Sequence, residues 1–174
     1  MEKNNTQQPI VNRQKFNLVA EADPSWEDYG WTREFLEDML YIEAYEPEHE
    51  WMNDHEILNN LGIIFSEAIG VRQDMEKAIK YFTRAIALDD DLARSNLADI
   101  YRKGTGGIEK DHALAFELYR ACHLPYAYYR VGEAYELGRG VAQDLEAAKE
   151  NYRIAYREGH PLARKKLQVF NFLR

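Results

Sequence analysis

A five-residue turn occurs three times in this 174-residue chain, and its spacing constrains the fold more than any other feature of the sequence. Each copy begins with glycine, continues with valine or isoleucine, and ends with aspartate. The copies are Gly70–Asp74, Gly107–Asp111 and Gly140–Asp144. Their spacing gives a period of about 35 residues, which lies in the range that marks repeat architectures. The sequence therefore predicts a stack of three similar units.

Each turn is flanked by two helical signatures. Before the turn come an apolar residue, a small residue and, three positions later, an aromatic residue; the copies are Leu61, Gly62 and Phe65; Leu97, Ala98 and Tyr101; and Val131, Gly132 and Tyr135. After the turn, alanine precedes an aromatic residue by four positions; the copies are Ala78 and Phe82, Ala115 and Tyr119, and Ala148 and Tyr152. Both spacings place their residues on one helical face. We therefore expect an all-α protein of paired helices, with small residues such as Gly132 at close helix contacts.

The stretch between the two signatures is longer than in the tetratricopeptide repeat, whose helix–turn–helix arrangement the chain otherwise shares. The additional residues form a Gly-x-Gly-Val-x-x-Asp turn, which is complete at Gly138–Asp144. On these motifs, residues 55–167 resemble the Sel-one-like repeat family, a relative of the tetratricopeptide repeats. The first copy departs from the pattern with Ala68 in place of the leading glycine, and the second has an extra residue within Gly104–Gly107. The resemblance implies a right-handed α–α solenoid with helical caps.

The remaining segments are expected to cap the solenoid, because an open stack needs terminal units. Asp23 followed by Pro24 is typical of a helix start, and Thr32 is expected to cap a second helix that ends at Tyr45. The apolar stripe of that helix is Phe35, Leu36, Met39, Leu40 and Ile42. The predicted domains are a polar segment 1–22, capping helices 23–54, three repeats at 55–90, 91–124 and 125–160, and a capping helix 161–174.

The aspartate at the end of each turn is expected to cap the second helix, where its oxygen accepts hydrogen bonds from free N–H groups. These residues are Asp74, Asp111 and Asp144. Cys122 occupies the repeat position held elsewhere by Ala85 and Ala155, so it is expected to be a small core residue.

Two clusters allow alternative interpretations. Trp26, Tyr29 and Trp31 are expected to pack onto the first repeat, with docking of a partner as the alternative. The basic residues near the C-terminus are expected to form a solvated face that complements a helix end, with a binding patch as the alternative. They are Arg164, Lys165, Lys166 and Arg174.

Charge and composition exclude several classes of partner and compartment. The formal net charge is −8, so the chain is expected to repel nucleic acid. The polar start, Met1 to Gln8, lacks the apolar core of a secretory signal, and no apolar stretch is long enough to span a membrane. Cys122 is the only cysteine and cannot form an internal disulfide. These features predict a cytoplasmic protein.

No motif predicts a catalytic, cofactor or metal site. The five histidines include no pair at the i, i+4 spacing that binds metal on one helix face. The Gly104–Gly107 cluster lacks the Lys-Ser/Thr of a phosphate-binding loop. An enzyme would require the carboxylates of Asp99, Glu133 and Glu136 to converge on one cavity, and we therefore expect a non-enzyme.

Partner binding is expected on the concave surface, which the first helices of such stacks line. Tyr126 and Tyr129 beside Glu133 and Glu136 would suit a basic protein surface. The alternative for Tyr126 is packing into the short connection 123–125. The helix faces that the core signature does not use are expected to be exposed on this surface. The predicted partner-binding residues on them are Glu56, Asn59, Ile63, Ser95, Asp99, Arg102, Tyr126, Tyr129, Glu133 and Glu136.

The function predicted from these features is a stand-alone, non-catalytic protein–protein interaction module. Bacterial proteins that the chain resembles act as regulators, adaptors or immunity proteins, and an acidic chain without catalytic groups suits an inhibitor that blocks a cognate toxin or effector. The alternatives are an adaptor with two binding surfaces and a structural solenoid that self-associates.

Overall fold

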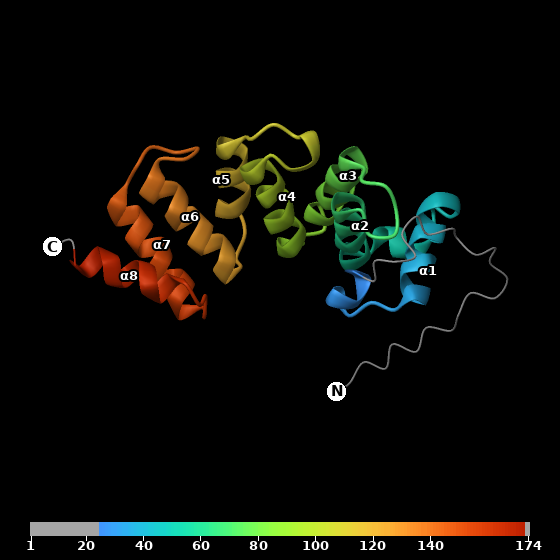
Figure 1. The fold of residues 1–174 in the computed structure, drawn as a ribbon, viewed down its shortest axis with the longest axis horizontal. Helices are drawn as coiled ribbons and strands as arrows, with labels where there is room; N and C mark the ends of the chain where they lie inside the picture. The colour runs from blue at the N-terminus through green and yellow to red at the C-terminus, as the bar shows by residue number, and fades with distance from the viewer. Residues whose placement is uncertain (1–24, 173–174) are drawn as a thin grey trace.

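The computed structural model describes residues 25–172, and every regular element in that range is a helix. Helix pairs follow one another along the long axis of the molecule (Figure 1). The predicted all-α solenoid is therefore confirmed. The elements are the 3-10 helices η1 (Ser25–Tyr29), η2 (Glu50–Asn53) and η3 (Thr105–Gly107), and the α-helices α1 (Arg33–Tyr45), α2 (His55–Glu67), α3 (Met75–Ile86), α4 (Asp91–Lys103), α5 (His112–Arg120), α6 (Pro125–Leu137), α7 (Leu145–Arg157) and α8 (Ala163–Phe172).

The helices form three pairs, each with a first helix before the turn and a second helix after it. The pairs are α2 with α3, α4 with α5, and α6 with α7, and each second helix also packs on the next first helix. Contacts thus join elements that are close in sequence, as expected for a repeat array. The helix α8 packs on α7 where a fourth first helix would lie.

The first helix of each pair ends at a residue in the left-handed conformation. These residues are Ala68, Gly104 and Gly138, with φ of 59°, 72° and 63°. Glycine adopts this conformation without steric cost, whereas alanine does not. The departure of Ala68 from the family pattern therefore leaves the geometry of the turn unchanged and adds local strain.

The turn aspartates make the same two contacts in every repeat. The Asp74 carboxylate accepts a hydrogen bond from the Lys77 N–H at 2.9 Å, and its own N–H donates to the Phe65 carbonyl at 3.0 Å. Asp111 and Asp144 likewise cap α5 and α7, and they donate to the carbonyls of Tyr101 and Tyr135. The predicted caps are confirmed, and each aspartate also ties the second helix to the first.

The N-terminal helix is attached to the first repeat by apolar and polar contacts. Thr32 caps α1 by accepting from the Phe35 N–H at 3.1 Å, and α1 ends at Tyr45, as predicted. Glu43 of α1 accepts hydrogen bonds at 2.8 Å from Lys77 and from the Tyr81 hydroxyl, both on α3. The predicted apolar stripe of α1 also packs inward. Phe35 is half-buried, and the other four members are buried: Leu36, Met39, Leu40 and Ile42.

Of the three aromatic residues before α1, Trp26 and Trp31 pack in the core and Tyr29 is largely exposed. Trp26 is buried and Trp31 packs against the same core, which favours the predicted packing onto the first repeat. Tyr29 stacks on Trp31 at 4.8 Å between ring centroids and remains 45% exposed. The predicted helix start at Asp23 and Pro24 lies outside the described residues.

Small residues lie where the helices of a pair approach most closely. A Cβ atom added to Gly132 would lie 2.8 Å from the Tyr152 ring, and one added to Gly62 would lie 2.5 Å from the Phe82 ring. Cys122 is also buried, as predicted, and its thiol lies 3.3 Å from the Asp91 carbonyl oxygen. The predicted close contacts and the small core position are confirmed.

Replacing Gly132 by leucine should destabilise the protein, because the new side chain would overlap the Tyr152 ring and force α6 and α7 apart. Overpacking of this kind costs about 1–3 kcal/mol of unfolding free energy. The matched control is Glu150→Leu, which places the same side chain on the exposed surface of α7. Thermal and urea unfolding of both variants tests this, and equal stability of Gly132→Leu and the wild type would contradict it.

Candidate functional site

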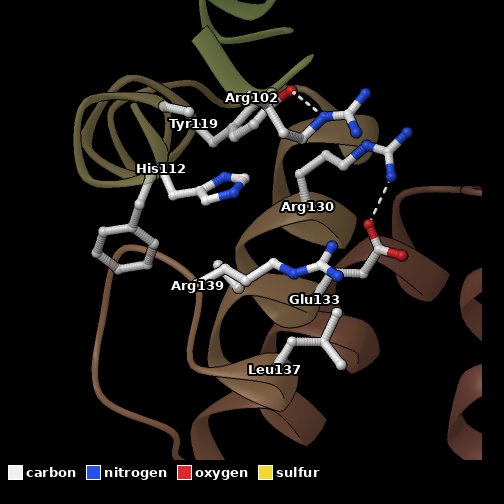
Figure 2. A pocket seen from close by; sticks show the side chains of 10 residues that line it. Arg102, His112, Tyr119, Arg130, Glu133, Leu137 and Arg139 are labelled. Atoms are coloured by element: carbon white, nitrogen blue, oxygen red, sulfur yellow. Dashed lines mark hydrogen bonds and ion pairs between the residues drawn. The ribbon is translucent and has the colours of Figure 1, made fainter. Parts of the chain in front are cut away.

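The first helices α2, α4 and α6 and the terminal helix α8 follow one another along the molecule, and their side is called here the first-helix face (Figure 1). Pockets lie between α2 and α4, between α5 and α6 beside Arg102 of α4, and between α6 and α8. The α2/α4 pocket is lined by Tyr29, Ile63, Ser66, Glu67, Phe82, Asn96, Asp99, Ile100, Lys103 and Thr105. The α4/α6 pocket, with α5 behind it, is lined by Arg102, His112, Ala115, Phe116, Tyr119, Arg130, Glu133, Ala134, Leu137 and Arg139 (Figure 2). The α6/α8 pocket is lined by Tyr129, Glu136, Leu162, Lys165, Lys166 and Val169.

The predicted partner-binding residues fall into three groups on this face. Glu56 is exposed, and six others are half-buried: Ile63, Asp99, Arg102, Tyr126, Glu133 and Glu136. The expected exposure of Asn59, Ser95 and Tyr129 is wrong, because these residues are 6%, 8% and 7% exposed. A role in binding for the accessible members stays a prediction.

Contacts with residues outside their own helix explain two of the three buried residues. The Asn59 side-chain oxygen accepts a hydrogen bond from Asn96 of the next first helix at 2.9 Å. Tyr129 stacks on His160, with 4.4 Å between ring centroids, and also contacts the Tyr152 ring. The neighbouring repeat therefore covers Asn59, whereas Tyr129 is covered by residues of its own repeat.

Asp99 is the polar centre of the junction between the second and third repeats. It accepts hydrogen bonds from the hydroxyls of Tyr119 on α5 and Tyr126 on α6, the latter at 3.0 Å. Arg102 and Lys103 each form an ion pair with it at 3.0 Å. Burial alone would raise the pKa of Asp99, but these hydrogen bonds and charges lower it to about 2. The carboxylate is thus held ionised as an internal link between three helices.

Glu136 has the corresponding role between the third repeat and the terminal helix. It accepts a hydrogen bond from the Tyr152 hydroxyl on α7 and another, at 2.6 Å, from Lys166 on α8. Burial, followed by the hydrogen bond to Glu136, raises the pKa of the Tyr152 hydroxyl. The interpretation of the C-terminal basic residues as a solvated face is therefore wrong for Lys166, whereas Arg174 lies outside the described residues.

The charges expected to attract a basic partner are largely neutralised inside the molecule. Asp99 and Glu136 are bound as described, and Glu133 forms an ion pair with Arg130 of the same helix. Because each carboxylate has a different set of internal partners, the three do not converge on one cavity. Residues 25–172 contain no group of three or more acidic, histidine or cysteine side chains placed to hold a metal ion. Attraction of a basic partner stays a prediction.

The sequence contains a signal for this internal pairing. The aromatic residue of the second helix is Phe82 in the first repeat, and the residues facing it on α2 include Ile63. In the second and third repeats the same position is tyrosine, and its hydroxyl donates to a carboxylate of the first helix, Asp99 or Glu136, which occupy different positions of the repeat. A change from phenylalanine to tyrosine that coincides with a new carboxylate therefore indicates an internal hydrogen bond rather than a free binding group.

Several side chains of the pockets were not among the predicted binding residues. Arg130 lies over the Tyr126 ring, 4.7 Å from its centroid, and lines the α4/α6 pocket beside Arg139 of the turn. Tyr126 is itself half-buried against the second-repeat core and hydrogen-bonded to Asp99. This favours packing over partner binding, the two alternatives given for Tyr126. The apolar members Leu137, Leu162 and Val169 are 49%, 54% and 51% exposed.

The family model of the Sel1 repeat matches three consecutive segments of the chain, residues 56–90, 92–121 and 125–160. The chain belongs to the Sel1 repeat family. Sel1 repeats are in general protein-interaction scaffolds without catalytic activity, so the predicted interaction module holds at this level.

Relatives of known sequence match about half of this chain and a small part of their own length. The chain is 35% identical over 94 residues to a Schizosaccharomyces pombe protein assigned as a component of an ERAD-associated E3 ubiquitin-protein ligase, covering 52% of this chain and 13% of that protein. It is 34% identical over 104 residues to chitin synthase regulatory factor 3 of the same yeast, covering 58% of this chain and 11% of that protein. The chain thus spans a small fraction of these relatives.

A solved structure shows the same architecture over most of its length. The crystal structure of a Sel1 repeat protein from Oxalobacter formigenes superposes with a TM-score of 0.63 at 29% sequence identity, covering 77% of this chain and 97% of that one. In the described part of this chain, no helix is both long and apolar enough to cross a membrane.

Replacing Asp99 by asparagine should flatten the pH dependence of stability between about pH 4 and pH 2. The folded-state pKa of Asp99 is below its ordinary value, so its contribution is fully present above the unfolded-state pKa and is lost as the pH falls toward 2. The contribution is at most about 2 kcal/mol. Urea unfolding at a series of pH values measures it, and parallel pH profiles for wild type and variant would contradict the assignment.

Proposed function

We propose that this chain is a regulatory protein-binding module that holds a segment of one partner along the first-helix face. The observation that carries the proposal is the series of three pockets along α2, α4, α6 and α8, of which the middle one also has α5 as a wall. A segment lying across the helices would meet the three pockets in turn. Sel1 family membership supports a protein as the partner.

The C-terminal half of the face has the composition of an interface core. Leu137, Leu162 and Val169 are each about half exposed, and they alternate with charged pocket residues such as Lys165. Exposed apolar side chains grouped in pockets and rimmed by polar residues are typical of protein interaction sites. The α6/α8 pocket is therefore the part of the face where substitution is expected to have the clearest effect.

An inhibitor of a cognate toxin or effector is one form of this function, and an adaptor is the other. A blocking inhibitor needs a single surface of about 800 Å² per partner, and one continuous face suits it. An adaptor needs a second surface, and the exposed Leu145 and Tyr156 of the second helix α7 lie outside the three pockets. The regulatory factor and the ligase component among the relatives are consistent with an adaptor.

The proposal is tested with the double substitution Leu162→Glu and Val169→Glu. Both side chains are exposed, so the fold should be retained, while two new charges in the α6/α8 pocket should abolish partner capture. The matched control is Leu145→Glu with Tyr156→Glu, which places the same charges at equally exposed sites on α7. Capture with the tagged chain, followed by mass spectrometry, is compared for the three proteins after circular dichroism has verified their folds.

Loss of one stoichiometric partner with the α8 variant (Leu162→Glu with Val169→Glu) but not with the α7 variant (Leu145→Glu with Tyr156→Glu) would support the first-helix face. Retention by the α8 variant and loss by the α7 variant would overturn it. Suppression of the partner's activity in the complex would identify an inhibitor, whereas joint capture of a second protein that only the α7 variant loses would identify an adaptor. A mass that rises with concentration and no other captured protein would indicate the self-associating solenoid.

A further inference from the structure

The α4/α6 pocket concentrates basic side chains in a chain whose net charge is −8. Arg102 of α4, Arg130 of α6 and Arg139 of the following turn all line it, and Glu133 is the only carboxylate among the lining residues. Figure 2 shows the guanidinium groups of Arg102 and Arg130 pointing to the same side, and the His112 ring pointing toward the arginines from α5. The side chains that line the pocket therefore carry a net positive charge, whereas the whole chain carries a net negative charge.

The three arginines differ in how far the protein neutralises them. Arg102 pairs with Asp99 at 3.0 Å and lies 3.3 Å from the Tyr119 hydroxyl oxygen. Arg130 pairs with Glu133, and its buried Nε–H has no acceptor among the described residues. The side chain of Arg139 makes no hydrogen bond or ion pair within residues 25–172. Arg102 shares Asp99 with Lys103, and Arg130 pairs with Glu133, so Arg139 is the arginine of this pocket without an internal partner.

Packing holds two of these arginines in position. The Arg130 guanidinium lies over the Tyr126 ring and near the Tyr129 ring, at 4.7 Å and 5.7 Å from their centroids. Arg102 is only 28% exposed and is fixed by Asp99 and Tyr119. Arginines held in this way lose little conformational entropy when they bind a planar carboxylate.

The remaining wall of the pocket is apolar. It consists of Ala115, Phe116, Ala134 and Leu137, of which Leu137 is exposed at the pocket edge. A ligand that fills the pocket would therefore place an anionic group against the arginines and an apolar group against α5 and α6. A peptide that carries a carboxylate next to an aliphatic or aromatic side chain has this combination.

We propose that the α4/α6 pocket binds an acidic peptide segment, with one carboxylate on Arg139 and Arg130 and a neighbouring apolar side chain on Phe116 and Leu137. A carboxylate carries the one negative charge that the unpaired Arg139 can match, whereas a phosphate carries nearly two. This proposal rests on the proposed function, because it takes the acidic segment to be part of the protein partner. The carboxylate is that of an aspartate or glutamate side chain or of a chain end.

The test uses three synthetic peptides and the full chain. The probe is acetyl-Gly-Leu-Glu-Leu-Gly-amide; the second peptide has glutamine in place of glutamate, and the third is the glutamine peptide with a free C-terminal carboxylate. Binding is followed by NMR on the arginine Nε–H resonances at low salt. The glutamate peptide should bind at least tenfold more tightly than the amidated glutamine peptide and should shift the resonances of Arg139 and Arg130. Binding of the third peptide would identify a chain end as an equivalent source.

The variant Arg139→Gln should weaken binding of the glutamate peptide by at least tenfold, because it removes the guanidinium that has no internal partner. Arg139 is exposed in the turn, so the thermal unfolding of the variant should match that of the wild type. The matched control is Arg153→Gln on the exposed surface of α7, which should bind like the wild type. Equal affinity for the glutamate and glutamine peptides, unchanged binding by Arg139→Gln, or no binding of any peptide would overturn the proposal.

These outcomes are separable from those of the proposed function. If no peptide binds while Leu162→Glu with Val169→Glu still abolishes partner capture, the α4/α6 pocket is not an acidic-peptide site. Partner binding on the first-helix face is then still supported. If the glutamate peptide binds in an Arg139-dependent way while the α8 variant keeps its partner, the pocket is an acidic-peptide site and the proposed partner face is wrong.

Discussion

One aspartate in each repeat connects its two helices, and the rest of the solenoid depends on that connection. The backbone N–H of Asp74 donates to the last aromatic residue of the first helix, while its carboxylate caps the second helix. Asp111 and Asp144 repeat both contacts. Each cap contributes about 1 kcal/mol, but its geometric effect is larger. It fixes how the turn leaves one helix and enters the next, and so it fixes the angle at which the small residues and the facing aromatic rings meet.

Hydrogen bonds and ion pairs of polar side chains connect each helix pair to the next element of the solenoid. Asp99 and Glu136 lie on the face predicted to attract a basic partner, yet their charges are used between helices of the same molecule. The groups that remain available in the C-terminal half are Arg139, Lys165 and the exposed aliphatic side chains. The two C-terminal pockets of the face therefore offer little free negative charge, which is why an acidic peptide suits the α4/α6 pocket.

The sequence predicted the features that repeat and missed several contacts between a first helix and the segments that pack on it. The caps, the α1 helix from Thr32 to Tyr45 and the close contact at Gly132 follow from local spacing, because each involves residues of one helix pair. Asn59 and Tyr129 were expected to be exposed because spacing within a helix places them away from the core of their own pair. Asn59 is buried by Asn96 of the next repeat, and Tyr129 by Tyr152 and His160 of its own repeat. The periodicity of a single helix contains no information on these neighbours.

The hydrogen bonds of the tyrosines and carboxylates also order the repeats along the chain. Tyr119 and Tyr152 donate to a carboxylate of their own repeat, but Asp99 also binds Tyr126 of the next repeat, and Glu136 binds Lys166 of the terminal helix. Each of these carboxylates is therefore shared across a boundary. Removing the third repeat as a unit, or moving it to the front of the array, would leave Asp99 or Lys166 without its partner. Although the three units share one backbone pattern, they are not interchangeable modules, and the length and order of the array are specified by side chains at their boundaries.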